Sequence, residues 1–332
     1  MSNWGGKHEL PDLLPGGDRR ITYQQAIAEA LDLALQDDRV RLFGEGVPDQ
    51  YHFYGTTEGL AEKYPERVFD TPVAEQVITG VGVGMALGGL RPIVIHPRND
   101  FLLLALDQLA NHAAKWDTMT GGKVQCPLTV ISVACRGWGS AAQHSQALHS
   151  TIAQFPGIDV AVPFTPLDAQ SAILWSVRES TRPLVVMLHK WLFSLMGRTC
   201  AGPNDRERTG IHRTGSDVTL VGISYGTVDC LMAVEPLLEK GISAEVIDLR
   251  WLRPLDIEPI VESVKHTTRL VVVDTGHLSF GASGEIVARV AERVQGVRFA
   301  RVATPDKPIP ASGEKDFFPN PDTVVKAVEN LM

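Results

Sequence analysis

Glu75 is a candidate for proton-transfer chemistry because it is the sole acidic side chain between Asp70 and Asp100. The residues Asp70-Thr71-Pro72 before it predict a helix start, with Thr71 as the cap and Pro72 in the first turn. The helix behind Glu75 is rich in glycine, and each interior glycine costs about 1 kcal/mol relative to alanine. We therefore expect another backbone or a flat ligand to pack closely against the glycines, which are Gly80, Gly82, Gly84, Gly88 and Gly89. Burial would raise the pKa of such a carboxyl toward the range useful for proton transfer. The alternative is an ordinary buried helix whose Glu75 faces solvent.

A second candidate is His144, which lies in the polar segment Gln143-His144-Ser145-Gln146 after a predicted strand at 128–133. Loops after strands commonly carry catalytic acids or bases, and histidine titrates near neutral pH. A purely structural histidine is the alternative. The usual nucleotide-binding and esterase motifs are absent, because neither G-x-G-x-x-G, G-x-x-x-x-G-K-[ST] nor G-x-S-x-G occurs in the chain.

Composition indicates a globular protein with a full core: 332 residues, 44% hydrophobic and 21% charged. A net charge of −8 without a basic stripe argues against a nucleic-acid partner. We expect no membrane association, because no apolar run is long enough to span a bilayer and no signal-type segment begins the chain. The four cysteines lack metal-ligand spacing, which predicts reduced thiols in a cytoplasmic protein.

The pattern of apolar segments predicts two α/β domains, each a mainly parallel sheet flanked by helices. An irregular arm covers residues 1–19, the first domain covers 20–190, a linker covers 191–212 and the second domain covers 213–332. Predicted strands of the first domain lie at 40–43, 68–69, 92–95, 128–133, 158–162 and 184–188, with a long helix at 101–119. Those of the second domain lie at 218–223, 244–249, 270–274 and 297–302.

An ordered set of short motifs extends this prediction from about residue 22 to the C-terminus. The motifs are Gly44-Glu45, Asp70-Thr71-Pro72-x-x-Glu75, Gly88-Gly89-Leu90-Arg91-Pro92, Asp100-Phe101, Asp107-Gln108, Gly121-Gly122, Gln143-His144-Ser145-Gln146 and, later, Asp248-Leu249-Arg250-x-Leu252-Arg253-Pro254-Leu255-Asp256. Together they resemble the β subunit of the thiamine-diphosphate-dependent 2-oxo acid dehydrogenase E1 component. That family includes pyruvate, branched-chain and acetoin enzymes and is similar to transketolase.

The resemblance implies a pyrimidine-binding domain followed by a transketolase-type C-terminal domain. It also implies that Glu75 holds N1′ of the aminopyrimidine, which favours the imino tautomer that takes the proton from thiazolium C2. His144 is implied to lie near the substrate, where it donates to an oxyanion or steers a proton. The other candidate cofactor contacts are Glu45, Arg98, Phe101 and Gln143, and the candidate substrate contacts are His96, Arg98 and His144.

The resemblance also implies that the site is shared with other chains. The Gly-Asp-Gly motif that binds magnesium and diphosphate belongs to the family's α subunit and does not occur here. We therefore expect no metal ligand in this chain and Mg²⁺ held mainly by an α-like partner. The expected assembly is α2β2 with a β–β contact, and a lipoyl acyltransferase is a further expected partner.

Arg98 is a departure from the family pattern, because most relatives have an aromatic residue there that stacks on the pyrimidine. A guanidinium is flat and can replace that ring. Alternatively, Arg98 binds a substrate carboxylate or phosphate, or it pairs with Asp100. The function predicted first is decarboxylation of a 2-oxo acid with transfer of the acyl unit. A transketolase-like carboligase and a non-catalytic scaffold are the alternatives.

Overall fold

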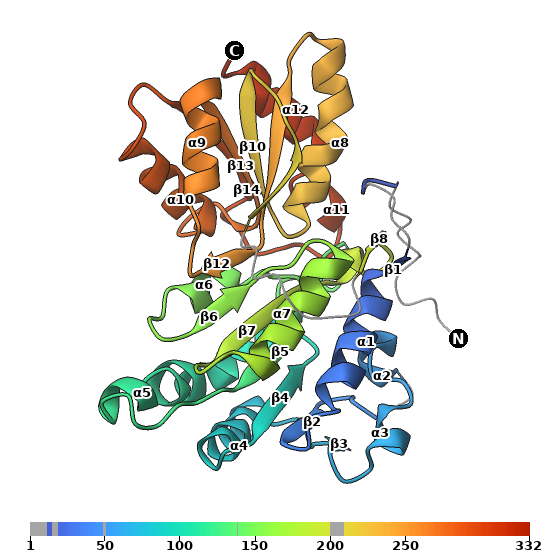
Figure 1. Ribbon diagram of the computed structural model, residues 1–332. Helices are drawn as coiled ribbons and strands as arrows, with labels where there is room; N and C mark the ends of the chain where they lie inside the picture. Colours follow the sequence, from blue (N-terminus) through green and yellow to red (C-terminus); the bar gives the residue numbers. More distant parts are fainter. Residues whose placement is uncertain (1–11, 15–18, 49–50, 138, 200–208) are drawn as a thin grey trace. The chain divides into compact units, whose positions relative to one another are not determined.

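The computed structural model describes residues 12–14, 19–48, 51–137, 139–199 and 209–332. These residues form two compact units (Figure 1), which we describe separately. The N-terminal unit runs to Ala134 and resumes at Ile152. The C-terminal unit contains Cys135–Thr151 and the chain after the gap at 200–208. Most of the predicted arm at 1–19 lies outside the described residues.

The N-terminal unit is built on a parallel sheet with the strand order β6-β7-β5-β4-β2-β3. Its strands are β2 (Val40–Gly44), β3 (Val68–Asp70), β4 (Arg91–His96), β5 (Thr129–Ala134), β6 (Asp159–Ala161) and β7 (Leu184–His189). β4, β5 and β7 are almost continuously apolar and buried, as expected for strands covered on both faces.

Helices cover both faces of this sheet because the chain moves across it in opposite directions. The β3–α4–β4 connection and the β6–α7–β7 connection run opposite ways, so right-handed crossovers place α4 (Glu75–Leu87) and α7 (Pro166–Arg178) on opposite faces. α1 (Tyr23–Ala34) packs on α7 (Figure 1). Thr22 caps α1 as its sequence pattern indicates, in a capping box with Gln25. A short antiparallel pair, β1 (Arg20–Thr22) and β8 (Met196–Arg198), was not predicted.

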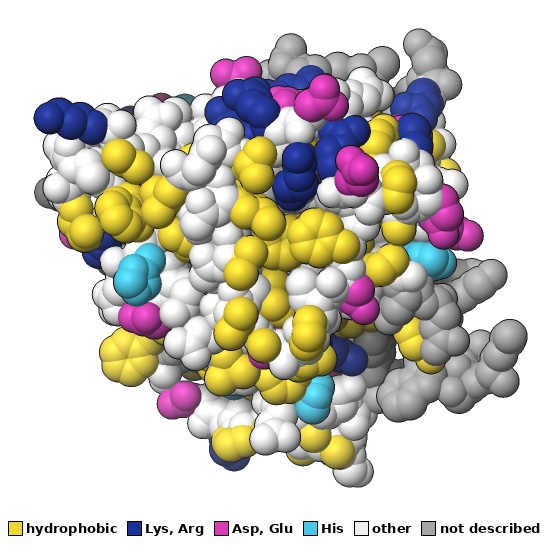
Figure 2. All heavy atoms as spheres, turned by 90° about the horizontal axis from the view of Figure 1, so that it is seen from below, with side chains coloured by type: hydrophobic (Ala, Val, Ile, Leu, Met, Phe, Trp, Pro, Cys, Tyr) yellow, Lys and Arg dark blue, Asp and Glu magenta, His cyan; other side chains and the backbone are white. Residues whose placement is uncertain are grey.

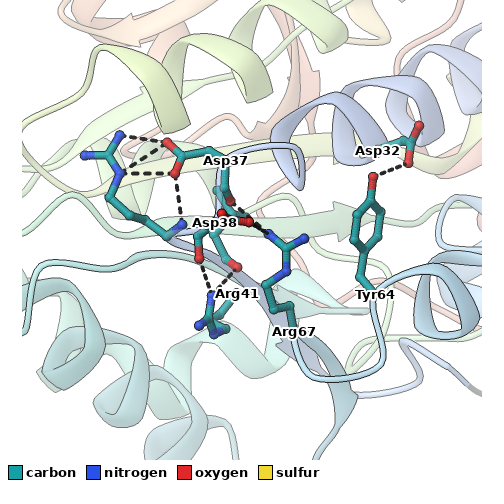
Figure 3. Close-up of polar contacts among 8 residues, drawn as sticks. Asp32, Asp37, Asp38, Arg41, Tyr64 and Arg67 are labelled. Carbon is teal, nitrogen blue, oxygen red and sulfur yellow. Dashed lines mark hydrogen bonds and ion pairs between the residues drawn. The ribbon is translucent and has the colours of Figure 1, made fainter.

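The turn from α1 into β2 is held by arginine side chains (Figure 3). Arg67 pairs with the carboxylate of Asp38 at 3.3 Å and donates to the Asp37 carbonyl, while Arg41 donates to the Asp38 carbonyl at 2.7 Å. Nearby, the Tyr64 hydroxyl donates to Asp32. This cluster fixes the amino end of β2, so the carboxyl end of the same strand remains available for a site.

The long helix predicted at 101–119 is wrong in detail. The segment consists of a 3₁₀ helix η1 (Asn99–Ala105), a π-helical turn η2 (Gln108–Ala113) and a short α5 (Trp116–Met119). The buried residues Leu102, Ala105, Leu109 and Ala113 are three or four apart. That spacing fits all three helix types approximately, so an apolar pattern alone does not separate them.

The C-terminal unit has its own sheet, with the strand order β14-β13-β10-β11-β9. The strands β10 (Val218–Ile223), β11 (Ala244–Leu249), β13 (Arg269–His277) and β14 (Arg298–Thr304) are parallel, and β9 (Thr209–Arg213) is antiparallel to β11. Its main helices are α8 (Gly226–Glu239), α9 (Glu258–Thr267), α10 (Ala282–Ala291) and α12 (Pro321–Glu329), and shorter elements include α11 (Glu314–Phe317).

These two sheets confirm the predicted fold class. In the part of the chain that the structure describes, no helix is both long and apolar enough to cross a membrane. Cys126, Cys135 and Cys230 are buried thiols, as predicted, and Cys200 lies outside the described residues.

Candidate functional site

The candidate site of the N-terminal unit lies at the carboxyl ends of β2, β3 and β4. From β2 the chain moves to β3 on one side, whereas from β4 it moves to β5 on the other side. Loops diverge at such a reversal, and open α/β sheets bind their ligands in the resulting crevice. Glu45 follows β2, Glu75 begins the helix after β3, and His96 ends β4. Strand order therefore brings these three sequence-predicted residues to one edge of the sheet.

Glu75 is 5% exposed and is the first residue of α4. The predicted helix start at Thr71 and Pro72 is wrong, because the N-cap is Ala74 and no side chain caps it. The Thr71 hydroxyl is instead buried without a hydrogen-bond partner. The non-helical segment between Asp70 and Glu75 bends at Val73, and Glu75 lies in the protein interior rather than facing solvent.

Glu45 lies within electrostatic reach of Glu75. Burial and the charge of Glu75 raise the pKa of Glu45 to about 7. A hydrogen bond from the Ala74 backbone acts in the opposite direction and lowers this pKa. One oxygen of Glu45, Oε1, is buried without a hydrogen-bond partner. A carboxyl with a pKa this close to neutral is available to take up or release a proton at physiological pH.

A close backbone approach sets the position of Glu45. Gly44 has φ of +144°, and a Cβ there would lie 2.2 Å from the carbonyl oxygen of Ile95 in β4. The Asp70 side chain accepts a hydrogen bond from the Gly46 backbone at 2.9 Å. Only glycine fits at position 44, which explains the Gly-Glu pair at the end of this strand.

His96 is fully buried, and its Nε2 lies 2.8 Å from the Thr79 hydroxyl, one helical turn after Glu75. Burial lowers the pKa of His96 to about 4, so the ring is neutral at physiological pH. Its other nitrogen, Nδ1, is buried without a hydrogen-bond partner. His96 is therefore a neutral ring that contacts the Glu75 helix through Nε2, and its Nδ1 has no hydrogen-bond partner among the described residues.

Arg98 and Phe101 lie on the segment that leaves β4, and both are partly buried. Arg98 is the extended residue before η1, and Asn99 beside it is fully buried with its amide donating to the Val133 carbonyl at 3.2 Å. Asn99, which the sequence analysis did not select, thus ties the Arg98 segment to the end of β5.

The glycines behind Glu75 have a different role from the one expected. Only Gly82 meets the sheet closely, since its Cβ would lie 2.8 Å from Val94 and 2.9 Å from Leu128. Around Gly84 the space is open, and a Cβ at Gly80 would lie 3.6 Å from the Gln108 side chain. Among the described residues, no backbone atom lies within 4 Å of a Cβ built at Gly80, Gly84 or Gly89, so the close backbone approach expected there is not seen.

Several buried polar atoms around the start of α4 have no hydrogen-bond partner among the described residues. They are Glu45 Oε1, Thr71 Oγ1, His96 Nδ1 and Gln108 Oε1. Buried polar groups are nearly always paired, so a cluster of exceptions calls for an explanation. Carboxylate, amide, hydroxyl and imidazole atoms without partners can bind a ligand that carries both hydrogen-bond donors and acceptors.

Gln143 and His144 belong to the C-terminal unit, on the segment that follows β5 in sequence. Gln143 is exposed, His144 is partly buried, and the His144 backbone donates to the Ala141 carbonyl. Ser145 is buried and its hydroxyl has no hydrogen-bond partner. Among the described residues, no group of three or more His, Cys, Asp or Glu side chains has the arrangement of a metal site.

Comparison with known proteins identifies the family of both parts of the chain. The transketolase pyrimidine-binding domain model matches residues 19–194, and the transketolase C-terminal domain model matches residues 207–324. The mitochondrial pyruvate dehydrogenase E1 component subunit beta-1 of Arabidopsis thaliana is 36% identical, over 94% of this chain and 89% of that protein. The acetoin:2,6-dichlorophenolindophenol oxidoreductase subunit beta of Cupriavidus necator is 33% identical, over 95% of this chain and 98% of that protein.

The chain belongs to the E1 β-subunit family. It is therefore a β-like subunit of the type found in thiamine-diphosphate-dependent 2-oxo acid dehydrogenases. Among solved structures, a split-gene transketolase described as an inactive β4 tetramer shares the fold, with a TM-score of 0.76 and 23% identity, over 95% of this chain and 98% of that one.

Sequence reasoning did not select Thr79 or Asn99, and it assigned Thr71 to a helix cap rather than to an unpartnered hydroxyl. Thr79 had a detectable signal, because it lies four residues after Glu75 and so on the same helical face. Thr71 had none, because a hydroxyl before proline resembles an ordinary helix cap.

Proposed function

We propose that this chain supplies the pyrimidine half of a thiamine diphosphate site in an enzyme that decarboxylates a 2-oxo acid. The observation that carries the proposal is the Glu45–Glu75 pair at the carboxyl edge of the sheet, among buried polar atoms that have no hydrogen-bond partner. Bound thiamine diphosphate supplies the carbon nucleophile and electron sink that this decarboxylation requires. We keep the predicted boundaries, 20–190 and 213–332 with the linker 191–212, as part of the proposal.

Glu75 would hold the pyrimidine ring and a proton at N1′. A buried carboxyl is suited to this, because its hydrogen bond to the ring is not weakened by water. Glu45 would contact the same end of the cofactor, and its raised pKa favours a protonated carboxyl beside the Glu75 carboxylate. Arg98, Phe101 and Gln143 remain proposed cofactor contacts, and His96 and His144 remain proposed substrate-side groups.

The remaining half of the site would come from an α-like partner carrying Gly-Asp-Gly, which would also hold Mg²⁺. Exposed apolar side chains at α4 support a protein partner close to Glu75: Val77 and Val81, one helical turn apart in α4, are 64% and 45% exposed, and Val73 just before the helix is 79% exposed. Leu103 and Leu104 of η1 are exposed as well. α4 lies at the bottom of Figure 1, and the view from below in Figure 2 shows apolar side chains gathered on that face.

The α2β2 assembly, the β–β contact, a lipoyl acyltransferase partner and a cytoplasmic location remain parts of this proposal. A second candidate function is a transketolase-like carboligase, in which a carbonyl compound accepts the aldehyde unit. Arg98 favours it, since a guanidinium beside the site could bind a phosphorylated or carboxylated acceptor.

Calorimetric titration of thiamine diphosphate with Mg²⁺ tests the half-site. We expect weak or no binding to the chain alone and tight binding to the chain purified with an α-like partner. Tight binding to the chain alone would contradict the proposal. Product analysis with a lipoyl domain or with an aldehyde acceptor then separates the dehydrogenase from the carboligase.

A further inference from the structure

The C-terminal sheet has a reversal of strand order of its own, and the segment that carries His144 is bound there at three places. From β10 the chain moves through α8 to β11 on one side, whereas from β13 it moves through α10 to β14 on the other side. The reversal lies between the neighbours β10 and β13, where such a sheet would bind a ligand. Within residues 136–149, the Arg136 and His149 side chains contact α8 and β13, and the backbones of Gly137 and Gly139 contact α11.

At the start of this segment, Arg136 is bound in a buried cage. Its side chain is 3% exposed, Nη2 lies 3.3 Å from the Asp229 carboxylate in the first turn of α8, and the guanidinium lies 4.5 Å from the Tyr225 ring centre. Phe318 lies on the guanidinium as well, at 5.1 Å. Burial raises the pKa of Asp229 to about 7, and the neighbouring Arg136 charge opposes that rise.

A backbone nest forms the next contact. Gly137 and Gly139 have φ of +77° and +70°, and their N–H groups both donate to the carboxylate of Glu314 in α11, Gly137 at 2.7 Å. Glu314 is buried, which is unusual for a glutamate without such partners. Successive N–H groups in this conformation commonly bind anions, and here the anion belongs to the same chain.

At the end of the segment, His149 is joined to β13. Its Nε2 lies 2.8 Å from Oδ1 of Asp274, and both side chains are at most 2% exposed. Asp274 also accepts hydrogen bonds from the backbones of Gly276 and Ser283. A Cβ at Gly276 would lie 3.2 Å from both Asp274 Oδ1 and His149 Nε2, so the absent side chain leaves room for the pair.

We propose that Asp229, Glu314 and Asp274 are positioning residues that hold the His144 segment for catalysis. The contacts lie on both sides of His144, at Gly139 before it and at His149 after it. In this inference, the crevice that would bind a ligand in the C-terminal sheet binds the enzyme's own loop. The inference rests on the role of His144 in the proposed function, since misplacing a catalytic group by about 1 Å can cost about a hundredfold in rate.

The test uses the full chain assembled with its α-like partner. His149→Leu removes the bond to Asp274, whereas His149→Gln keeps a donor at nearly the same place. We expect His149→Leu to lower kcat by about 10- to 100-fold and to leave the affinity for thiamine diphosphate within about twofold, and we expect His149→Gln to restore most of kcat. His212→Leu is the matched control, because His212 faces the buried Asp248 of the same unit at 3.5 Å. It should affect stability without affecting kcat.

A mutant cycle with His144→Ala distinguishes positioning from a general structural effect. If His149 acts through His144, then His149→Leu should lower kcat little further once His144 is alanine. An equal loss in both backgrounds would overturn the inference. If His144→Ala alone left kcat unchanged, there would be nothing to position and the inference would be wrong, while the half-site function would still be judged by cofactor titration.

A second variant covers the case in which His149→Leu does not fold. Gly276→Ala keeps every charge and crowds the His149–Asp274 contact. We expect the same direction of change in kcat and faster amide exchange at Gly137 and Gly139. Unchanged kcat together with faster exchange would overturn the inference, because the segment would then have loosened without consequence for catalysis.

Discussion

Replacing Glu45 by glutamine should stabilise the chain at alkaline pH, although glutamate is the residue proposed for function. Burial and the Glu75 charge raise the pKa of Glu45 from its ordinary 4.5 to about 7. That difference corresponds to about 3 kcal/mol, and solvent screening of a half-buried carboxyl reduces the expected effect to about 1–2 kcal/mol. A folded-state pKa that is raised means that the folded chain binds more protons between pH 4.5 and 7. Stability from this group is therefore fully present below pH 4.5 and is lost as pH rises through 7.

Urea unfolding of the isolated chain at about pH 4.5 and pH 8 measures this effect. The difference in unfolding free energy between Glu45→Gln and wild type should grow by about 1–2 kcal/mol in favour of the variant from the lower to the higher pH. Glu66→Gln is the control, because Glu66 is exposed in the same unit, and its difference should stay constant. A Glu45→Gln difference that does not change with pH would refute the raised pKa of Glu45, which burial causes first and the Glu75 charge second.

Three further predictions concern the same edge of the sheet. Glu75→Gln should leave the fold intact and slow hydrogen–deuterium exchange at C2 of the cofactor in the assembled enzyme by at least about a hundredfold; an unchanged rate would make Glu75 structural. If Arg98 binds a substrate anion, Arg98→Ala should raise KM and leave the affinity for the cofactor unchanged. If Arg98 stacks on the cofactor, Arg98→Ala should instead lose about 1–3 kcal/mol of cofactor affinity, and Arg98→Phe should keep that affinity. Burial lowers the pKa of His96 to about 4, so the contribution of His96 to stability is present above pH 6.5 and is lost as pH falls through 4. The His96→Gln variant should therefore lose less stability than wild type over that pH range. Acid titrations followed by circular dichroism measure this difference.

The parallel sheets were predictable because buried strands are short, apolar and separated by amphipathic helices. β10 and β11 have the bounds that the sequence indicates, 218–223 and 244–249. β9 and β8 were missed inside the predicted linker, because neither is continuously apolar or buried. A strand whose pairing partner lies far along the sequence leaves little local signal.

Local chemistry was harder to predict than topology. Thr71 and Pro72 have the composition of a helix start, yet α4 begins three residues after Pro72 and its N-cap, Ala74, makes no side-chain bond. A hydrogen bond between the Ala74 backbone and Glu45 explains the difference, since a carboxyl from the neighbouring strand end takes the place of a local cap. Local propensity describes only the preference of the isolated segment for a helix start, and here a tertiary contact determines where the helix begins.

The segment at 135–151 shows a second limit of sequence reasoning. It follows β5 directly, so its position in the chain suggests the first sheet, but its buried contacts are with α8, β13 and α11. Each partner lies more than 90 residues away in sequence, and no periodicity connects them. In the structure Arg136 and His149 are buried basic side chains, which need acidic partners. The sequence offers many acids, and only the strand order of the second sheet identifies Asp229 and Asp274 as those partners.

Both halves of the chain therefore use the same property of a parallel sheet for different purposes. At the reversal between β2 and β4, the loops leave buried polar atoms without partners, and that incompleteness points to an external ligand. At the reversal between β10 and β13, the acids Asp229 and Asp274 are paired with basic side chains from one continuous segment. At this second reversal the unpartnered buried atoms include the hydroxyls of Ser145 and Ser283, but the buried acids have basic partners from the chain itself, so this segment serves as an anchor. At the first reversal, a carboxylate oxygen of Glu45 is among the unpartnered atoms. Pairing of the buried acids thus distinguishes the two reversals where topology alone does not.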